Sequence, residues 1–192
     1  MISTSGHLIS KFPEVRFHRT RIFNKGQVRN YVLVTMGLNT SLRIGDLLHL
    51  RWGDVYDFQK KCYRGHIVLK EQKTGKENKV ALNYEAKAAL NRLLKDGNTD
   101  NDYLFQSGTG KNQPIGRVCA YKIIRKAVNE LHIEGTIRCH SLRKTFGYHA
   151  WKKGVPPALI MSIYNHSSIE ITKRYLSIDQ DDKDQVFLKM NL

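Results

Sequence analysis

The apolar residues of the chain change their spacing twice, and this feature constrains the possible folds most strongly. In residues 26–37 and 41–52, apolar side chains recur at intervals of three and four, which is the period of amphipathic helices. Residues 55–82 are rich in strand formers instead, and the helical period returns after them. The sequence therefore predicts a mainly α fold with a small antiparallel β-sheet, in the α+β class.

The strand-forming segment is expected to contain a tight hairpin. Residues 65–70 and 78–82 are candidate strands, and Gly75 lies between them, where a glycine suits a turn. This arrangement places Lys73 at or near the tip of the hairpin. We expect the whole segment to form a three-stranded antiparallel sheet.

The rest of the chain is expected to be helical and to belong to one domain. No repeat or Ser/Pro-rich linker divides the sequence, so residues 25–192 are expected to form a single domain after an irregular basic lead-in over residues 1–24. We expect Gly97 to cap the helix that precedes it. The predicted helices beyond the sheet are residues 84–95, 114–131, 141–153, 157–164, 169–176 and 181–190.

A large positive charge indicates a polyanionic partner. The 192 residues include 32 Lys and Arg against 17 Asp and Glu, which gives a net charge of +15 and a sequence pI near 9.8. Such a surplus attracts nucleic acid through phosphate contacts and counterion release. A basic protein without such a partner is the plain alternative, and an anionic membrane surface is less well matched because the charge is spread over the chain.

Several other classes of protein find no support in the sequence. No apolar run approaches the roughly 20 residues of a membrane helix, and the N-terminus lacks an apolar signal segment, so we expect a cytoplasmic protein without a membrane partner. The three cysteines are odd in number and lack a C-x-x-C pair, which indicates reduced thiols. Nucleotide-binding and zinc-protease motifs are absent, so we expect no cofactor and no metal.

Three short segments carry the residues best suited to chemistry on an anion. His140 and Arg143 are three residues apart at a predicted helix start, a spacing that places both on one face. His166 lies in a predicted turn, and Tyr175 follows nine residues later beside two basic residues. Each segment alone is a weak signal, whereas the set indicates a site for a phosphate.

These segments, together with an earlier one, resemble the tyrosine recombinases, or phage-type integrases, and specifically their C-terminal catalytic domain. The stretch from Asn39 to Asp54, with Arg43 followed three residues later by Asp46, is similar to the first box of the family. Three pieces of this sequence resemble the second box of the family: His140-Ser-Leu-Arg143, Asn165-His166-Ser-Ser and Tyr175. Lys73 lies where the family has its hairpin lysine.

The resemblance implies catalytic residues Arg43, Lys73, His140, Arg143, His166 and Tyr175, and the chemistry of these side chains agrees. Two guanidinium groups can clamp the non-bridging oxygens of a phosphodiester. Tyr175 is then the nucleophile, His140 its proton acceptor, and Lys73 the acid that protonates the leaving 5′ oxygen. Lys76 is the next candidate for that acid, and Asp46 is expected to support the arginine or its helix.

The resemblance also implies an activity and partners. The expected enzyme is a site-specific recombinase that cleaves and rejoins double-stranded DNA through a 3′-phosphotyrosyl intermediate, without metal or ATP, for a prokaryotic or phage mobile element. A homotetramer on two DNA sites, monomeric without DNA, is expected. Residues 181–192 are candidates for docking in cis or onto a neighbouring subunit. An inactive DNA-binding module and a type IB topoisomerase are the alternatives.

The sequence departs from the family pattern at a few positions. Lys144 and Asn165 stand where many members have histidine and glycine, and Asp46 stands where glutamate is more common. Asparagine tolerates a left-handed backbone conformation, so the turn before His166 remains feasible. Most members also carry a separate helical domain on the N-terminal side, so we expect this sequence to be either the catalytic part of a longer protein or a minimal variant.

Overall fold

The structure is a computed structural model that describes residues 27–133, 136–176, 184, 187, 188 and 190. It confirms a mainly helical fold with small antiparallel sheets. The elements, in chain order, are α3 (Val28–Thr40), α4 (Ile44–Leu48), α5 (Trp52–Val55), β1 (Tyr56–Asp57), β2 (Cys62–Tyr63), β3 (His66–Lys70), β4 (Glu77–Ala81), α6 (Tyr84–Leu93), α7 (Arg117–Glu130), α8 (Cys139–Lys152), α9 (Pro157–Ile163) and α10 (Ile169–Leu176).

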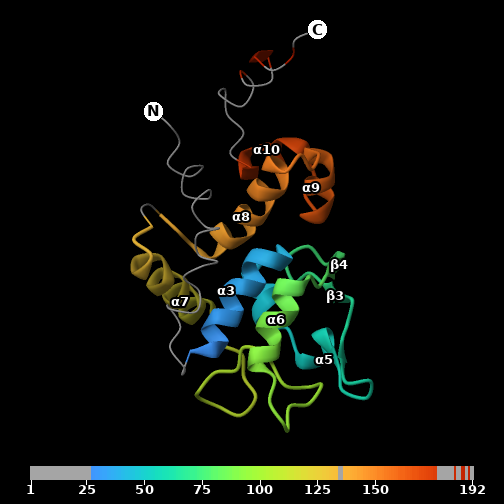
Figure 1. Cartoon of the computed structure of the whole chain (residues 1–192), viewed down its shortest axis with the longest axis vertical. Coiled ribbons are helices and arrows are strands. Elements are labelled where there is room, and N and C mark those ends of the chain that lie inside the picture. The colour runs from blue at the N-terminus through green and yellow to red at the C-terminus, as the bar shows by residue number, and fades with distance from the viewer. Residues whose placement is uncertain (1–26, 134–135, 177–183, 185–186, 189, 191–192) are drawn as a thin grey trace.

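The helices form two groups that meet along α3 and α8. Helix α3 packs against α6, α7 and α8, while α9 and α10 pack against α8 and against each other (Figure 1). The hairpin of β3 and β4 lies beside the end of α3 that faces α8 (Figure 1). The predicted lead-in over residues 1–24 and most of the predicted helix over residues 181–190 lie outside the described residues. Within the described part of the chain, no helix is long and apolar enough to cross a membrane.

The prediction of one three-stranded sheet is wrong. Strand β1 pairs with β2, and β3 pairs separately with β4, both antiparallel, so that two sheets of two strands result. The candidate strands on either side of Lys73 are confirmed, with His66 opposite Ala81 and Lys70 opposite Glu77. The Arg64 amide donates to the Val55 carbonyl at 2.8 Å, which continues the register of β1 and β2, so this segment pairs on the β1 side and not with β3.

The predicted helix over residues 41–52 is also wrong in its extent. Arg43 has extended backbone angles, and the helical residues after it split into α4 and α5. The interruption has a structural cause, because Arg51 bridges to Tyr103 and the Trp52 amide donates to the carbonyl of Asp102 at 2.9 Å. Residues 51 and 52 therefore tie this region to a distant loop, and the helix does not continue through them.

Two predicted helix ends differ as well. Gly97 does not cap α6, which ends at Leu93 with Leu94 in an extended conformation, although Gly97 does adopt a positive φ of 89° in the following turn. Helix α7 begins at Arg117 and not at Pro114, because Pro114 is held in a bridge to Gln106.

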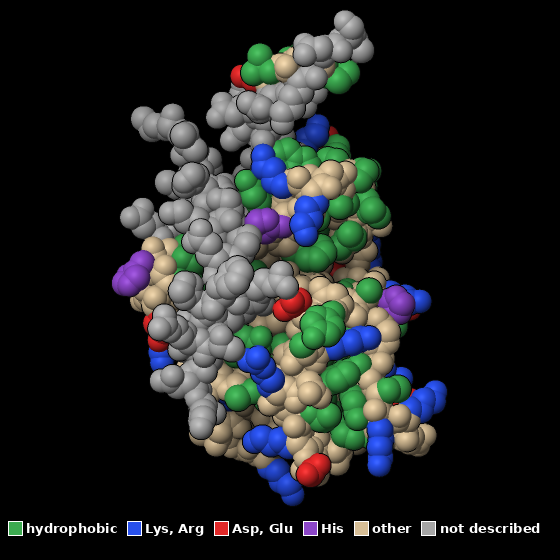
Figure 2. Space-filling model, viewed as in Figure 1, with side chains coloured by type: hydrophobic (Ala, Val, Ile, Leu, Met, Phe, Trp, Pro, Cys, Tyr) green, Lys and Arg blue, Asp and Glu red, His purple; other side chains and the backbone are tan. Residues whose placement is uncertain are grey.

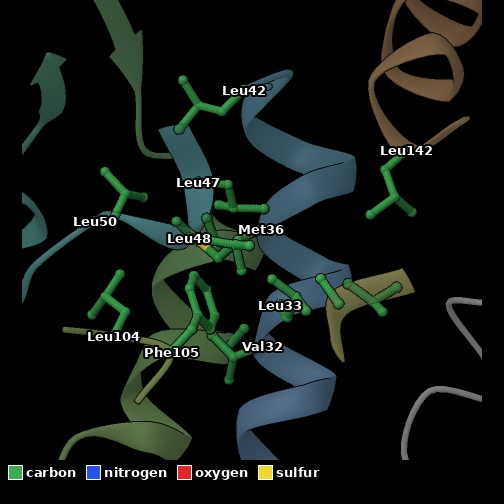
Figure 3. Packing of buried hydrophobic residues seen from close by; sticks show 14 of the residues in the cluster. Val32, Leu33, Met36, Leu42, Leu47, Leu48, Leu50, Leu104, Phe105 and Leu142 are labelled. Carbon is green, nitrogen blue, oxygen red and sulfur yellow. The ribbon is translucent and has the colours of Figure 1, made fainter. Parts of the chain in front are cut away.

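The main core lies where α3 meets the chain segments around it. Val32, Leu33 and Met36 on α3 contact the buried side chains of α4 and of the loop that carries Leu104 and Phe105 (Figure 3). Burying each large aliphatic side chain stabilises the fold by about 1.5–3 kcal/mol relative to exposure. This core holds the C-terminal end of α3 in place, and Arg43 lies three residues after the last residue of that helix, Thr40.

A close helix contact joins this core to the C-terminal helices. A Cβ atom on Gly37 of α3 would lie 2.6 Å from Cδ1 of Leu142 on α8, so only glycine allows this approach. Leu142 is itself part of the main core (Figure 3). The contact therefore brings Arg143, the next residue on α8, next to the chain that leaves α3.

A second, smaller core fixes α9 and α10 on α8. It contains Ile160, Tyr164 and Leu176, all fully buried. Gly147 of α8 permits it, since a Cβ atom there would lie 2.1 Å from the Tyr164 hydroxyl. The cluster sets the position of α10 and therefore of Tyr175, which precedes Leu176.

Candidate active site

Arg43 occupies the extended link between α3 and α4. Helix α3 ends at Thr40, and the next residue, Ser41, has a left-handed φ of 54° that turns the chain sharply. The Arg43 side chain forms an ion pair with Glu71, and its Nη2 atom lies 3.5 Å from the backbone oxygen of Tyr164. Its side chain is 16% exposed, so it retains access to a ligand.

Arg143 is fixed by the backbone around it. Its side chain is 2% exposed; Nη1 donates to the carbonyl of Ser41, and Nη2 donates to the carbonyl of Tyr164 at 2.7 Å. The guanidinium carbon lies 4.4 Å from the ring centroid of Tyr164, whose hydroxyl donates back to the Arg143 carbonyl at 2.6 Å. Since a guanidinium has five N–H groups, donors remain for an anion. Both arginines thus converge on the Tyr164 backbone oxygen.

Tyr175 and His140 face each other across the gap between α10 and α8. The Tyr175 hydroxyl lies 3.4 Å from Nδ1 of His140. The Tyr175 ring makes edge contacts with the rings of Tyr164 and His166, at centroid separations of 5.5 and 5.0 Å. Lys144 places its Nζ atom 5.4 Å from the centroid of the same ring. The phenol is therefore held among aromatic rings and close to a cation.

His166 is oriented by a neighbouring hydroxyl. Its Nδ1 atom lies 3.0 Å from Oγ1 of Thr172, and that hydroxyl also lies 3.5 Å from the carbonyl of Ser168, to which it donates. This pattern assigns the proton to Nδ1 and leaves Nε2 as an acceptor. Asn165, the residue before it, has a φ of 50°, the left-handed conformation expected of that turn.

Lys73 lies in the exposed turn between β3 and β4, as the sequence predicts. The turn is tied to α4, because the amide of Gln72 donates to Oδ1 of Asp46 at 2.9 Å. The buried carboxylate of Asp46 thereby holds the hairpin turn beside α4, and its support of the arginine or its helix stays a prediction. The residue that pairs with Arg43 is Glu71.

The positive charges of the site lower the pKa values of both histidines. Burial and the charges of Arg143, Lys73, Arg43 and Lys144 lower the pKa of His140. At neutral pH the imidazole of His140 is therefore uncharged and able to accept a proton.

The pKa of His166 falls further, to about 4, through burial and the charges of Arg143 and Arg43. An unfolded chain has a histidine pKa of about 6.5, so it binds more protons than the folded protein between these values. The contribution of His166 to stability is therefore complete above about pH 6.5 and is lost as the pH falls toward 4.

We accordingly expect His166→Gln to reduce the sensitivity of the protein to acid. When the pH falls from about 7.5 to about 5, the unfolding free energy of the wild type should fall by about 1 kcal/mol more than that of the variant. This difference takes into account that solvent screens the charge of a partly buried ring. Urea unfolding at both pH values measures this difference, with the exposed His66→Gln as the matched control. Equal losses in wild type and His166→Gln would contradict the assignment.

The structure adds residues that the sequence analysis did not select. Glu71 is 1% exposed and Tyr164 is fully buried, and both contact the arginines. Neither lies at a recognisable motif spacing. Lys144 was noticed only as a departure from the family pattern, but it contacts the ring of Tyr175.

The six predicted catalytic residues come from five separate parts of the fold: the link between α3 and α4, the turn between β3 and β4, helix α8, the turn before α10, and α10 itself. Arg43, Arg143, His140, His166 and Tyr175 are linked by the contacts above. Lys73 lies in the turn that Glu71 connects to Arg43. Lys and Arg side chains are spread over the visible face of the molecule, including the part formed by the upper helices (Figure 2). Within the described residues, no group of three His, Cys, Asp or Glu side chains is placed to hold a metal ion.

Comparison with known proteins identifies relatives over most of the chain. Residues 14–181 match the model of the phage integrase family. "Probable integrase/recombinase YoeC" of Bacillus subtilis (strain 168) is 37% identical over 173 residues, which cover 90% of this chain and 88% of that protein. "Type 1 fimbriae regulatory protein FimE" of Escherichia coli (strain K12) is 28% identical, over 77% of this chain and 73% of that protein.

Solved structures share the fold at lower sequence identity. The crystal structure of XerA recombinase has a TM-score of 0.69 and 23% identity, covering 98% of this chain and 64% of that one. XerH site-specific recombinase, bound to a palindromic difH substrate in a post-cleavage complex, has a TM-score of 0.70 and 20% identity, covering 97% of this chain and 50% of that one. The chain thus spans between half and two thirds of these two recombinases.

The family match covers most of the chain, and the first of these relatives exceeds 30% identity over nearly its whole length. The helical fold with its small sheets is that of the tyrosine recombinase catalytic domain. The chain belongs to the phage integrase family.

Proposed function

We propose that this protein cleaves and rejoins double-stranded DNA at specific sites, with Tyr175 as the nucleophile. The observation that carries the proposal is the approach of the Tyr175 hydroxyl to His140, at 3.4 Å from Nδ1, beside the two converging guanidinium groups. A nucleophile, a neutral base and two fixed cations are the groups that phosphoryl transfer requires.

In the proposed first step, the phenol oxygen of Tyr175 attacks the phosphorus of a DNA phosphodiester. Its proton passes to Nδ1 of His140, and the bond between phosphorus and the 5′ oxygen breaks. The guanidinium groups of Arg43 and Arg143 stabilise the charge on the non-bridging oxygens. The product is a 3′-phosphotyrosyl ester and a free 5′ hydroxyl, and the attack of a 5′ hydroxyl from another strand reverses the step.

Lys144 is proposed to assist this attack. A cation 5.4 Å from the ring centroid of Tyr175 favours the build-up of negative charge on the phenol as its proton leaves. This lysine also helps to lower the pKa of His140, which keeps the base uncharged.

Lys73 is proposed to protonate the leaving 5′ oxygen, and this role predicts a chemical rescue. Lys73→Ala should slow cleavage of ordinary DNA by about 10²–10⁴-fold, the usual contribution of a general acid. DNA with sulfur in place of the bridging 5′ oxygen should be cleaved at nearly the wild-type rate, because a thiolate with a pKa of about 8.5 leaves without protonation. Single-turnover cleavage of both substrates measures the effect.

Lys76→Ala is the matched control, since Lys76 lies in the same exposed turn. It should cleave both substrates as wild type does. If the sulfur substrate rescues Lys76→Ala and does not rescue Lys73→Ala, the general acid is Lys76. Equal slowing of both substrates by Lys73→Ala would contradict the role altogether.

The relatives and the charge support a proposal for the biological setting. One relative is named an integrase/recombinase, and the XerH structure contains its DNA substrate. With the net charge of +15, these support double-stranded DNA as the partner. We propose integration or excision of a mobile element in the cytoplasm, without metal or ATP, by a homotetramer on two DNA sites that is monomeric without DNA.

The test is covalent capture from a DNA library. Nicked duplexes with a randomised segment lose a short strand on cleavage, so the covalent complex cannot religate. Wild-type protein in the presence of a metal chelator should yield a DNA-linked band in denaturing gels, and the captured sequences should share a motif. Capture without a motif would favour a type IB topoisomerase, and no capture despite DNA binding would favour an inactive DNA-binding module.

A further inference from the structure

Glu71 is a buried carboxylate in a site built from cations, and the catalytic steps above do not use it. It follows β3 directly and is 1% exposed. A carboxylate next to a phosphate site opposes phosphate binding, so its presence there calls for a physical role. Its contacts provide that role, because they join two parts of the site.

The first set of contacts fixes the turn that carries Lys73. The Thr74 hydroxyl donates to Oε2 of Glu71 at 2.6 Å, and the Glu71 carbonyl accepts from the Gly75 amide at 2.8 Å. The Glu71 amide donates to the carbonyl of Lys76 at 2.9 Å. Glu71 therefore holds both ends of the turn through its side chain and its backbone.

The second set of contacts reaches the phosphate clamp and the next strand. Oε2 of Glu71 also forms the ion pair with Arg43, and Oε1 accepts from the Asn78 amide at 3.1 Å. Because one carboxylate oxygen serves both Thr74 and Arg43, the position of the turn and the position of the guanidinium depend on the same atom. Hydrogen bonds from Thr74 and Arg43, together with the charge of Arg43, outweigh burial and lower the pKa of Glu71, so it is ionised.

We propose that Glu71 is a positioning residue that couples the Lys73 turn to Arg43, so that the general acid and the phosphate clamp are set as one unit. This inference deepens the proposed function and rests on it for its kinetic consequences. The coupling itself is a property of the free protein and can be measured without DNA.

The first experiment measures the coupling in the free protein. Arg43→Gln removes the charge on the other side of Glu71, and amide hydrogen exchange of Gln72 and Gly75 by NMR reports on the turn. Loss of the ion pair should speed this exchange by about tenfold. Unchanged exchange in the turn would overturn the coupling, whatever the protein does to DNA.

The second experiment measures DNA cleavage and separates the effect of the Glu71–Arg43 ion pair from that of the Glu71–Thr74 hydrogen bond. Glu71→Gln keeps the size of the side chain but loses the ion pair, and Thr74→Val loses only the hydroxyl that ties the turn. Both variants should slow cleavage of ordinary DNA by at least about tenfold. On the 5′-sulfur substrate Thr74→Val should recover nearly fully, and Glu71→Gln only partly, because Arg43 is also displaced.

Glu77→Gln, an exposed change on the same hairpin, is the matched control and should behave as wild type on both substrates. Equal slowing of both substrates by both Glu71→Gln and Thr74→Val would indicate a purely structural role and overturn the inference, as would wild-type rates in Glu71→Gln. If wild-type protein fails to cleave either substrate, the proposed function fails, and the exchange measurement alone decides the coupling.

Discussion

Tyr175→Phe is expected to abolish covalent attachment of the protein to DNA while leaving DNA binding intact. The substitution removes the oxygen proposed to attack phosphorus and preserves the ring that packs against Tyr164 and His166. Among the described residues, the hydroxyl contacts His140 at 3.4 Å, and loss of this one weak contact should lower the unfolding free energy by less than about 1 kcal/mol. Denaturing gels after incubation with captured DNA, together with a gel-shift measurement, report both properties.

Tyr84→Phe provides the matched control, because Tyr84 is 81% exposed on α6. It should form the covalent complex as wild type does. A DNA-linked band of normal intensity in Tyr175→Phe would contradict the assignment of the nucleophile. Loss of DNA binding in that variant would show that the hydroxyl acts in recognition and not in chemistry.

Arg143→Ala is expected to lose both catalysis and stability. Removing a donor that stabilises the charge of the transition state costs about 10²–10³-fold in rate. The carbonyls of Ser41 and Tyr164 would also lose their guanidinium partner in a buried site, which we expect to cost about 3 kcal/mol of unfolding free energy. Single-turnover cleavage and urea unfolding measure the two losses.

Arg143→Lys separates charge from geometry. A single ammonium restores the charge but cannot bridge two carbonyls and still offer paired donors to a phosphate, so little activity should return. Arg43→Lys, at the more exposed arginine, should lose activity with a smaller loss of stability. Wild-type stability in Arg143→Ala, or full activity in Arg143→Lys, would contradict this account of the clamp.

The sequence was sufficient to predict the local structure that carries most of the site. The apolar period predicted α10 over residues 169–176, as the structure has it, and the candidate strands placed Lys73 in a turn. The left-handed conformation of Asn165 was also expected. These features depend on residues close together in the chain, where propensity and spacing act directly.

Contacts between segments that are distant in the chain could not be predicted from the sequence. Tyr164 lies at the end of α9, and nothing in its neighbourhood indicates that its backbone oxygen accepts from Arg143 and lies near Arg43. Glu71 resembles any other charged residue of the hairpin until its 1% exposure is known.

The most direct measurement of the central claim is the chemical identity of the bond between protein and DNA. After capture, nuclease and trypsin digestion should leave a peptide over residues 175–183, with Tyr175 as its one tyrosine, carrying a nucleotide through its 3′ phosphate. Mass spectrometry with fragmentation locates the modified residue and the polarity of the link. A 3′-phosphotyrosyl bond at Tyr175 is the predicted result, whereas a 5′ link or a bond to any other residue would contradict the mechanism.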